Sequence, residues 1–187
     1  MNRLMTRRRE AARLRSRVKG NRMSAIYQRA SVRQYTNDPV TDDDVRAILR
    51  AAMAAPSAGN QQPWEFWVTR DEAKREELAA ASKYATPCRR APLVLTFCLR
   101  IEARFPSMLQ QDMGACVENA LIEAADLGLG AVWMGIYPEA DRMEAVRAAL
   151  ALPDGVEPFA LVAVGHPADT PEPQGAARFD DTRIHWE

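Results

Sequence analysis

The chain alternates amphipathic helical segments with short apolar runs. The clearest helix lies between Thr41 and Pro56, because its apolar residues recur at i, i+3, i+4, i+7 and i+8, the spacing of a helix with one buried face. Thr41 is a good N-cap, and the acidic residues at 42–44 complement the helix dipole in the first turn. The apolar stripe consists of Val45, Ile48, Leu49, Ala52 and Met53.

The remaining segments predict a mixture of strands and helices. Apolar runs predict strands over 64–69, 93–99 and 159–165. Further helices are predicted over 71–82, 108–127 and 139–150, with a short helix or turn from Ser24 and a loop over 86–92. Gly128 follows the longest helix as a C′ glycine. Because strict βαβ alternation is absent, the predicted class is α+β.

The glycine-containing run 128–135 superficially resembles a dinucleotide-binding fingerprint. Its spacing is wrong, and it follows a helix, whereas the fingerprint must follow a strand. We therefore interpret it as a turn that leads into a short strand.

Composition favours one ordinary globular domain. A chain of 187 residues can bury a substantial core, and 47% hydrophobic with 27% charged residues is typical of soluble proteins. No apolar run approaches the ~20 residues of a membrane span. We therefore do not expect a membrane protein, and we expect one domain over residues 23–187.

The zero net charge hides a basic segment at the N-terminus. Residues 1–22 carry eight Arg and one Lys against one Glu, about +8, which leaves the remainder near −8. The segment lacks the apolar region of a secretory signal. It is interpreted as a solvated arm or as a leader upstream of a start at Met23. The alternative is an arm that binds nucleic acid or an anionic membrane. Nucleic-acid binding is disfavoured, because no aromatic residues interleave the arginines and the body is acidic.

Cysteine and histidine usage argues against a metal site. The chain has an odd number of cysteines, and none of them forms a C-x-x-C pair; they are Cys88, Cys98 and Cys116. This favours a protein of the reducing cytoplasm. The two histidines, His166 and His185, both lie near the C-terminus. No metal constellation is expected.

Two segments carry candidate binding chemistry. In an extended backbone, Arg29, Ser31 and Arg33 point to one side, and guanidinium groups with a hydroxyl suit an anion such as phosphate. The alternative is a solvated surface strand. The small-residue loop 56–60 (PSAGN) would let a flat ring approach the backbone, although the same residues also form ordinary turns. Together the two segments suit a phosphorylated heteroaromatic cofactor.

The order of these motifs resembles the FMN-dependent nitroreductase family. The resemblance rests on RASVRQY, APSAGNQQPWEF, DMGACVENALIEAADLGLG and VGHP, and it spans about residues 24–180. It implies an α+β homodimer, with an antiparallel-rich sheet flanked by helices and two FMN sites at the subunit interface. Small residues along the 108–127 helix would then form a dimer seam, although core packing alone also explains them.

The resemblance also implies roles for individual residues. Arg29, Ser31 and Arg33 would contact the FMN phosphate and the ribityl and pyrimidine groups, and Arg178 would complete the phosphate site. Ala30 stands where many members carry a second basic residue, which weakens one phosphate contact. The loop formed by Pro56, Ser57, Ala58 and Asn60 would reach the isoalloxazine of the partner subunit, and the backbone at Met134 and Gly135 would approach flavin N5.

The implied activity is oxidoreduction. NADH or NADPH would pass a hydride to the flavin, and a nitroaromatic, quinone or related acceptor would then take its place in a ping-pong cycle. No catalytic side chain is expected, since the flavin carries the chemistry. Phe105 and Met108 are candidates for the acceptor pocket, or ordinary packing residues, and the short chain implies a reduced substrate lid. Alternatives are another flavin chemistry on the same fold, namely dehalogenation, azoline or enamide redox or flavin breakdown, and a non-catalytic flavin-binding protein.

Overall fold

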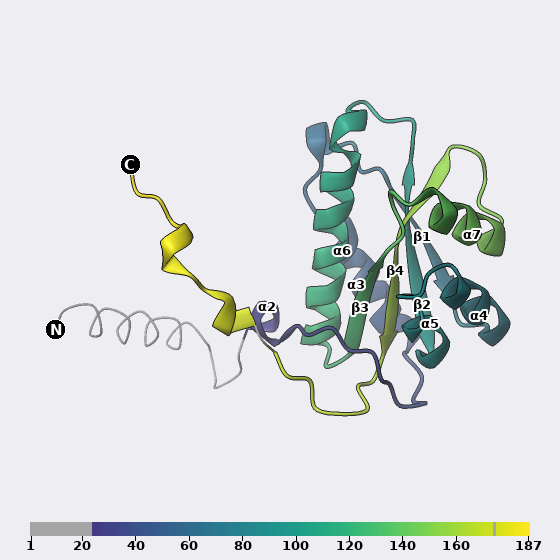
Figure 1. The fold of residues 1–187 in the computed structure, drawn as a ribbon, viewed down its shortest axis with the longest axis horizontal. Coiled ribbons are helices and arrows are strands. Elements are labelled where there is room, and N and C mark those ends of the chain that lie inside the picture. Colours follow the sequence, from purple (N-terminus) through teal and green to yellow (C-terminus); the bar gives the residue numbers. More distant parts are fainter. Residues whose placement is uncertain (1–23, 174) are drawn as a thin grey trace.

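A four-stranded antiparallel sheet forms the centre of the molecule (Figure 1). The computed structural model describes residues 24–173 and 175–187, so the basic segment 1–22 lies outside the described residues. The strands are β1 (Trp64–Thr69), β2 (Leu93–Arg100), β3 (Gly130–Gly135) and β4 (Val156–Gly165), in the order β1-β2-β4-β3. The predicted α+β class is confirmed.

Helices cover both faces of the sheet (Figure 1). On one face, α3 (Asp42–Met53) and α6 (Leu109–Asp126) pack on alternate residues of β2 such as Leu95 and Phe97. On the other face, α4 (Glu72–Ala80), α5 (Pro87–Arg90) and α7 (Ala140–Leu150) cover the intervening residues, including Val94. The alternation follows from the two-residue period of a strand. The shorter elements are α2 (Ala25–Gln28), η1 (Ala58–Asn60), η2 (Pro106–Met108), η3 (Gly175–Arg178) and η4 (Asp181–Arg183).

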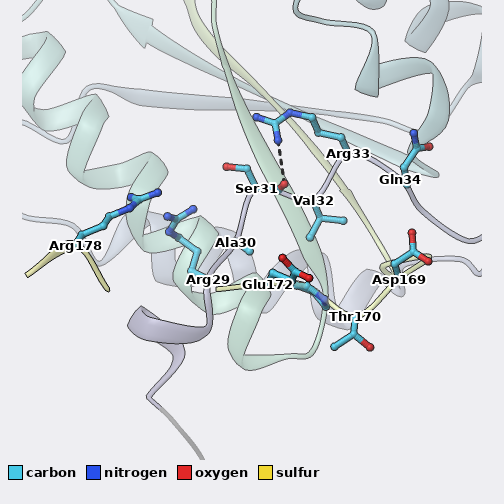
Figure 2. Close-up of a pocket in the computed structure, with 11 residues that line it drawn as sticks. Arg29, Ala30, Ser31, Val32, Arg33, Gln34, Asp169, Thr170, Glu172 and Arg178 are labelled. Carbon is cyan, nitrogen blue, oxygen red and sulfur yellow. Dashed lines mark hydrogen bonds between the residues drawn. The ribbon is translucent and has the colours of Figure 1, made fainter. Parts of the chain in front are cut away.

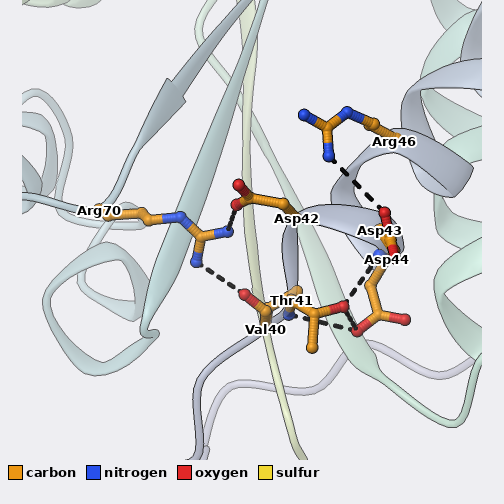
Figure 3. Close-up of polar contacts among 7 residues, drawn as sticks. All are labelled: Val40, Thr41, Asp42, Asp43, Asp44, Arg46 and Arg70. Atoms are coloured by element: carbon orange, nitrogen blue, oxygen red, sulfur yellow. Dashed lines mark hydrogen bonds and ion pairs between the residues drawn. The ribbon is translucent and has the colours of Figure 1, made fainter.

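The first residues of α3 form a complete capping box (Figure 3). Thr41 Oγ1 accepts a hydrogen bond from the Asp44 backbone N–H at 3.1 Å, and Asp44 Oδ2 accepts one from the Thr41 N–H at 3.2 Å. The guanidinium of Arg70 donates to the Val40 carbonyl and to Asp42 Oδ1, at 2.7 and 2.8 Å. The capping box confirms Thr41 as the predicted N-cap. The contacts of Arg70, which were not predicted, fix the start of α3 to the residue that follows β1.

Most predicted boundaries lie within two residues of those observed, but two segments differ more clearly from the sequence-based prediction. The predicted loop over 86–92 contains α5, which begins at a proline, a residue well suited to the first helical turn. β4 begins at Val156 rather than at 159, because a bulge opposite Phe97 and Cys98 accommodates the strand. The carbonyl of Phe159 in this bulge accepts from the N–H groups of Ile136 and Tyr137.

Thr96 at the middle of β2 supplies a stability prediction. It is fully buried, and its hydroxyl has no hydrogen-bond partner among the described residues. Because a buried unsatisfied hydroxyl costs free energy, Thr96→Val should raise the free energy of unfolding by about 1 kcal/mol. Urea denaturation checks this. The control Thr96→Ser keeps the hydroxyl and should destabilise; a Thr96→Val variant less stable than wild type would show that the hydroxyl is satisfied.

Within the described ranges, no helix has the length and apolar character needed to cross a membrane.

Candidate functional site

The segment that carries Arg29, Ser31 and Arg33 lies along the outer edge of β3. Ser31 forms a parallel bridge with Ala131, and the Val32 N–H donates to the Ala131 carbonyl at 3.0 Å. The approach is close, because a Cβ added at Gly130 would lie 2.7 Å from the Val32 Cβ. Glycine at 130 therefore lets this segment lie against the sheet.

Tyr35 fixes the far end of the same segment. Its hydroxyl lies within hydrogen-bonding distance of the carbonyls of Val32 and Ala163. Burial raises the pKa of the Tyr35 phenol, so it remains a protonated donor across the physiological range. The Thr36 N–H also donates to the His166 carbonyl, at 2.9 Å. The segment is thus held at both ends by backbone groups of the sheet and its extensions.

The segment opens into a pocket of about 460 Å³. Figure 2 shows Arg29, Ser31 and Arg33 at this opening, together with Arg178 from η3. The extended backbone therefore brings the three alternating residues to one place, as their spacing predicts. The complete lining consists of residues 29–34, residues 169–172 and Arg178.

One side of the pocket is lined mainly by basic side chains. Arg29 is largely buried, with 19% of its side chain exposed, and its Nε lies 3.3 Å from Glu118 Oε1 on α6. Arg33 Nη1 donates to the Ser31 carbonyl at 3.1 Å, which leaves other guanidinium donors available. Three guanidinium groups face one opening, whereas the carboxylates of Asp169 and Glu172 belong to the segment that lines its other part (Figure 2). The arrangement can hold a dianion such as a phosphate monoester.

The 169–172 segment was not predicted as part of the site. Tyr35 pairs with Pro167 and the Ala168 N–H donates to the Gln34 carbonyl, so the chain after β4 passes alongside residues 34–36. These are backbone contacts between distant segments. The only sequence signal was the proline-rich composition, which marks a loop and not its location.

The open edge of β3 continues from the basic pocket toward Gly135. The Ala131 carbonyl points away from β4, toward Val32, and backbone directions alternate along an antiparallel strand. Trp133 and Gly135 therefore present their N–H groups to the outer edge, while the Met134 N–H points toward β4. The Met134 side chain is buried, whereas a Cβ added at Gly135 would meet nothing within 4 Å. Arg142 Nη1 donates to the Gly135 carbonyl at 3.2 Å.

The small-residue loop lies in a different place. Pro56, Ser57, Ala58 and Asn60 do not line the basic pocket of their own chain. They lie beside the first turn of α6, where Asp112 Oδ1 accepts from the Ala58 N–H at 2.9 Å. The predicted residues thus form two groups in one protomer, a basic pocket with the β3 edge and a separate loop. In the described part of the chain, no cluster of His, Cys, Asp and Glu could hold a metal ion.

Comparisons with known proteins identify the family and the fold. A protein of Archaeoglobus fulgidus assigned as an NADH dehydrogenase/NAD(P)H nitroreductase is 38% identical, and the match covers 88% of this chain and 97% of that protein. A Clostridium acetobutylicum crystal structure assigned as an NADH oxidase superposes with a TM-score of 0.82 at 39% identity, covering 87% of this chain and 98% of that one.

A third relative was crystallised with a flavin nucleotide. This Desulfovibrio desulfuricans protein, assigned as a nitroreductase in complex with FMN, superposes with a TM-score of 0.71 at 38% identity, covering 79% of this chain and 87% of that one. The family model described as the nitroreductase family matches residues 26–100 and 83–166, most of the described domain. The chain belongs to the nitroreductase family.

Proposed function

We propose that this protein is an FMN-dependent oxidoreductase that takes electrons from NADH or NADPH and passes them to nitroaromatic, quinone or related acceptors. The observation that carries the proposal is the pocket at which Arg29, Ser31, Arg33 and Arg178 meet, beside the open edge of β3. When bound, FMN would supply the redox chemistry for two successive half-reactions at one place. The acceptor is expected to be a small, flat molecule.

The protein's own contribution is binding and orientation. Arg29, Arg33 and Arg178 would pair with the phosphate, and the Ser31 hydroxyl would add a hydrogen bond. Ala30 lines the same pocket with a methyl group, so it adds contact without charge. The outward N–H of Gly135 would donate to the ring system, which has free space to approach there. The predicted contact from Met134 is wrong for its N–H group, which points toward β4, and its side chain is buried, so Gly135 is the donor that remains.

We propose further that the protein is a homodimer whose sites lie between the subunits. This would explain why Pro56, Ser57, Ala58 and Asn60 lie apart from the basic pocket of their own chain, since the loop would serve the partner's pocket. α6 also offers surface for a partner helix: a Cβ added at Gly114 would meet nothing within 4 Å. The three cysteines are free and buried, and we place the protein in a reducing cytoplasm.

Visible absorption of the purified protein tests the proposal. We expect flavin bands that bleach on anaerobic addition of NADH or NADPH and return when a quinone such as menadione is added. Bands that bleach with neither nucleotide would refute the proposed donor and favour a different flavin chemistry. A colourless protein that cannot be loaded with FMN would refute the site. Sedimentation equilibrium of the loaded protein tests the dimer, and a monomer would refute the shared site.

A further inference from the structure

The loop from Ser57 to Gln62 is held in an unusual backbone conformation. Gly59, Asn60 and Gln62 all lie in the left-handed region, with φ of 53°, 56° and 47°. Non-glycine residues pay a free-energy cost there and persist only where their surroundings enforce the conformation. Within the loop, Ser57 Oγ accepts from the Gln62 N–H and Asn60 Oδ1 accepts from Gln62 Nε2, both at 3.0 Å.

A buried carboxylate on α6 accepts hydrogen bonds from this loop. Asp112 is 5% exposed and lies in the first turn of α6, where the helix dipole favours a negative charge. Oδ1 accepts from the Ala58 N–H at 2.9 Å, and Oδ2 accepts from Gln61 Nε2 at 2.6 Å. Both oxygens of Asp112 are therefore used on the loop. The structure shows no ion pair for Asp112 among the described residues, so its charge is compensated by these donors.

Gln61 connects this support to a second segment of the chain. Its Oε1 accepts from the Phe105 N–H at 2.9 Å, and its Nε2 donates to the Phe105 carbonyl at 3.3 Å. The carboxamide thus pairs with the backbone of Phe105 as a neighbouring strand would. One side chain ties the loop, α6 and residue 105 together, and we name these contacts the Asp112–Gln61–Phe105 latch.

The latch places an aromatic ring against the loop. The Phe105 ring packs on Gly59 so closely that a Cβ at Gly59 would overlap it. The Arg104 guanidinium lies 5.1 Å from the ring centroid, and 37% of Phe105 remains exposed. The ring therefore has the loop on one side and open space on another. A flat molecule lying against the small-residue loop would meet this ring.

From this geometry we infer that Asp112 and Gln61 are positioning residues for acceptor selection. They hold the loop and Phe105 as one rigid unit, and Phe105 limits the size of the acceptor. The inference rests on the proposed function, because it assumes that the loop faces the flavin of the partner subunit. Loosening the latch should admit larger acceptors relative to small ones, since the ring would no longer be held in place.

A polarity exchange tests the latch. Gln61→Glu brings two carboxylates together, and Asp112→Asn opposes two amide NH2 groups, so each single variant breaks the 2.6 Å contact. The double variant Gln61→Glu/Asp112→Asn restores the contact between residues 61 and 112 with donor and acceptor exchanged, and the Ala58 and Phe105 N–H groups keep acceptors. It loses the 3.3 Å bond to the Phe105 carbonyl, because a carboxylate has no N–H to donate. Gln111→Glu, the same change at an exposed neighbour of Asp112, is the matched control.

The readout is the ratio of kcat/KM for menadione to that for 1,4-benzoquinone. We expect each single variant to raise this ratio about tenfold, because a change of about one methylene in an apolar pocket alters discrimination by about 10- to 200-fold. The double variant should return most of the way to the wild-type ratio, stopping short because the bond to the Phe105 carbonyl is lost, and Gln111→Glu should match wild type. Single variants with an unchanged ratio, or a double variant that remains as altered as the singles, would overturn the inference.

A surface substitution keeps the inference testable if the single variants do not fold. Phe105→Leu removes the ring from an exposed position and should also raise the ratio about tenfold, since it enlarges the space for the acceptor. An unchanged ratio would show that Phe105 does not limit the acceptor. FMN occupancy and the rate of anaerobic flavin reduction by NADH and by NADPH are measured on every variant. A wild-type protein that binds no FMN, or whose flavin neither nucleotide reduces, would refute the proposed function. An altered ratio in a variant that keeps both properties is an effect of the latch alone.

Discussion

Substitution of Arg33 by alanine should raise the Kd for FMN by about ten- to a hundredfold. Hydrogen bonds to charged groups each contribute about 1.5–3 kcal/mol, and every 1.4 kcal/mol is a factor of ten. Arg33 is exposed at the opening of the basic pocket, and its guanidinium is oriented by the Ser31 carbonyl. Arg33→Lys should recover only part of the loss, because an ammonium group cannot bind phosphate as a planar fork. Calorimetric titration of the apo-protein with FMN at fixed salt measures both.

Arg46→Ala is the matched control for this substitution. Arg46 is an exposed arginine on α3 that pairs with Asp43 at 3.6 Å and does not line the pocket (Figure 3). Its loss should leave FMN binding unchanged. The affinity difference between Arg33→Ala and wild type should also shrink as salt increases, since exposed charges are screened. Equal FMN affinity in the two alanine variants would remove Arg33 from the phosphate site.

Local sequence signals predicted most of the fold. Three elements were placed correctly: α3, β1 and β2. Each is determined by residues close together in the sequence, namely the apolar stripe and N-cap Thr41 of α3 and the apolar runs of the two strands. The start of β4 was missed because Pro158 normally weakens a strand. Here it lies beside a bulge, and the pairing that creates the bulge involves residues about sixty positions away.

The candidate site was predictable only where the alternation of side chains along an extended backbone determines which way they point. Extended backbone at 29–33 was enough to bring Arg29, Ser31 and Arg33 to one pocket. The latch had a weaker signal, a charged residue at position 112 on the apolar stripe of a predicted helix, next to Met113 and Cys116. Such a residue must be paired when buried, but its partners Ala58 and Gln61 come from a loop about fifty residues earlier. Sequence pattern alone does not indicate that contact.

The three buried thiols should make the protein increasingly unstable above pH 9. Burial raises the pKa of Cys88, Cys98 and Cys116 from 9.0 to about 12. Between these values the unfolded chain loses thiol protons that the native state retains, so stability falls as pH rises. Each thiol contributes about 1.4 kcal/mol per pH unit, and three give about 4 kcal/mol per unit. Because domains are stable by about 5–15 kcal/mol, a domain at the low end of this range should unfold at pH ~10, and one of about 11 kcal/mol at pH ~12.

Urea denaturation at pH 8, 9, 10 and 11, in the presence of reductant and at fixed protein concentration, measures this slope. Cys116→Ala separates the thiols from other alkaline effects, such as ionisation of the buried Tyr35 phenol, whose pKa is also raised by burial. The variant should be slightly less stable at pH 8, because it loses buried contacts. Its stability should fall less steeply above pH 9, by about 1.4 kcal/mol per pH unit. Parallel pH profiles for the variant and wild type would mean that Cys116 is ionised as readily in the native state as in the unfolded chain, which its complete burial on α6 argues against.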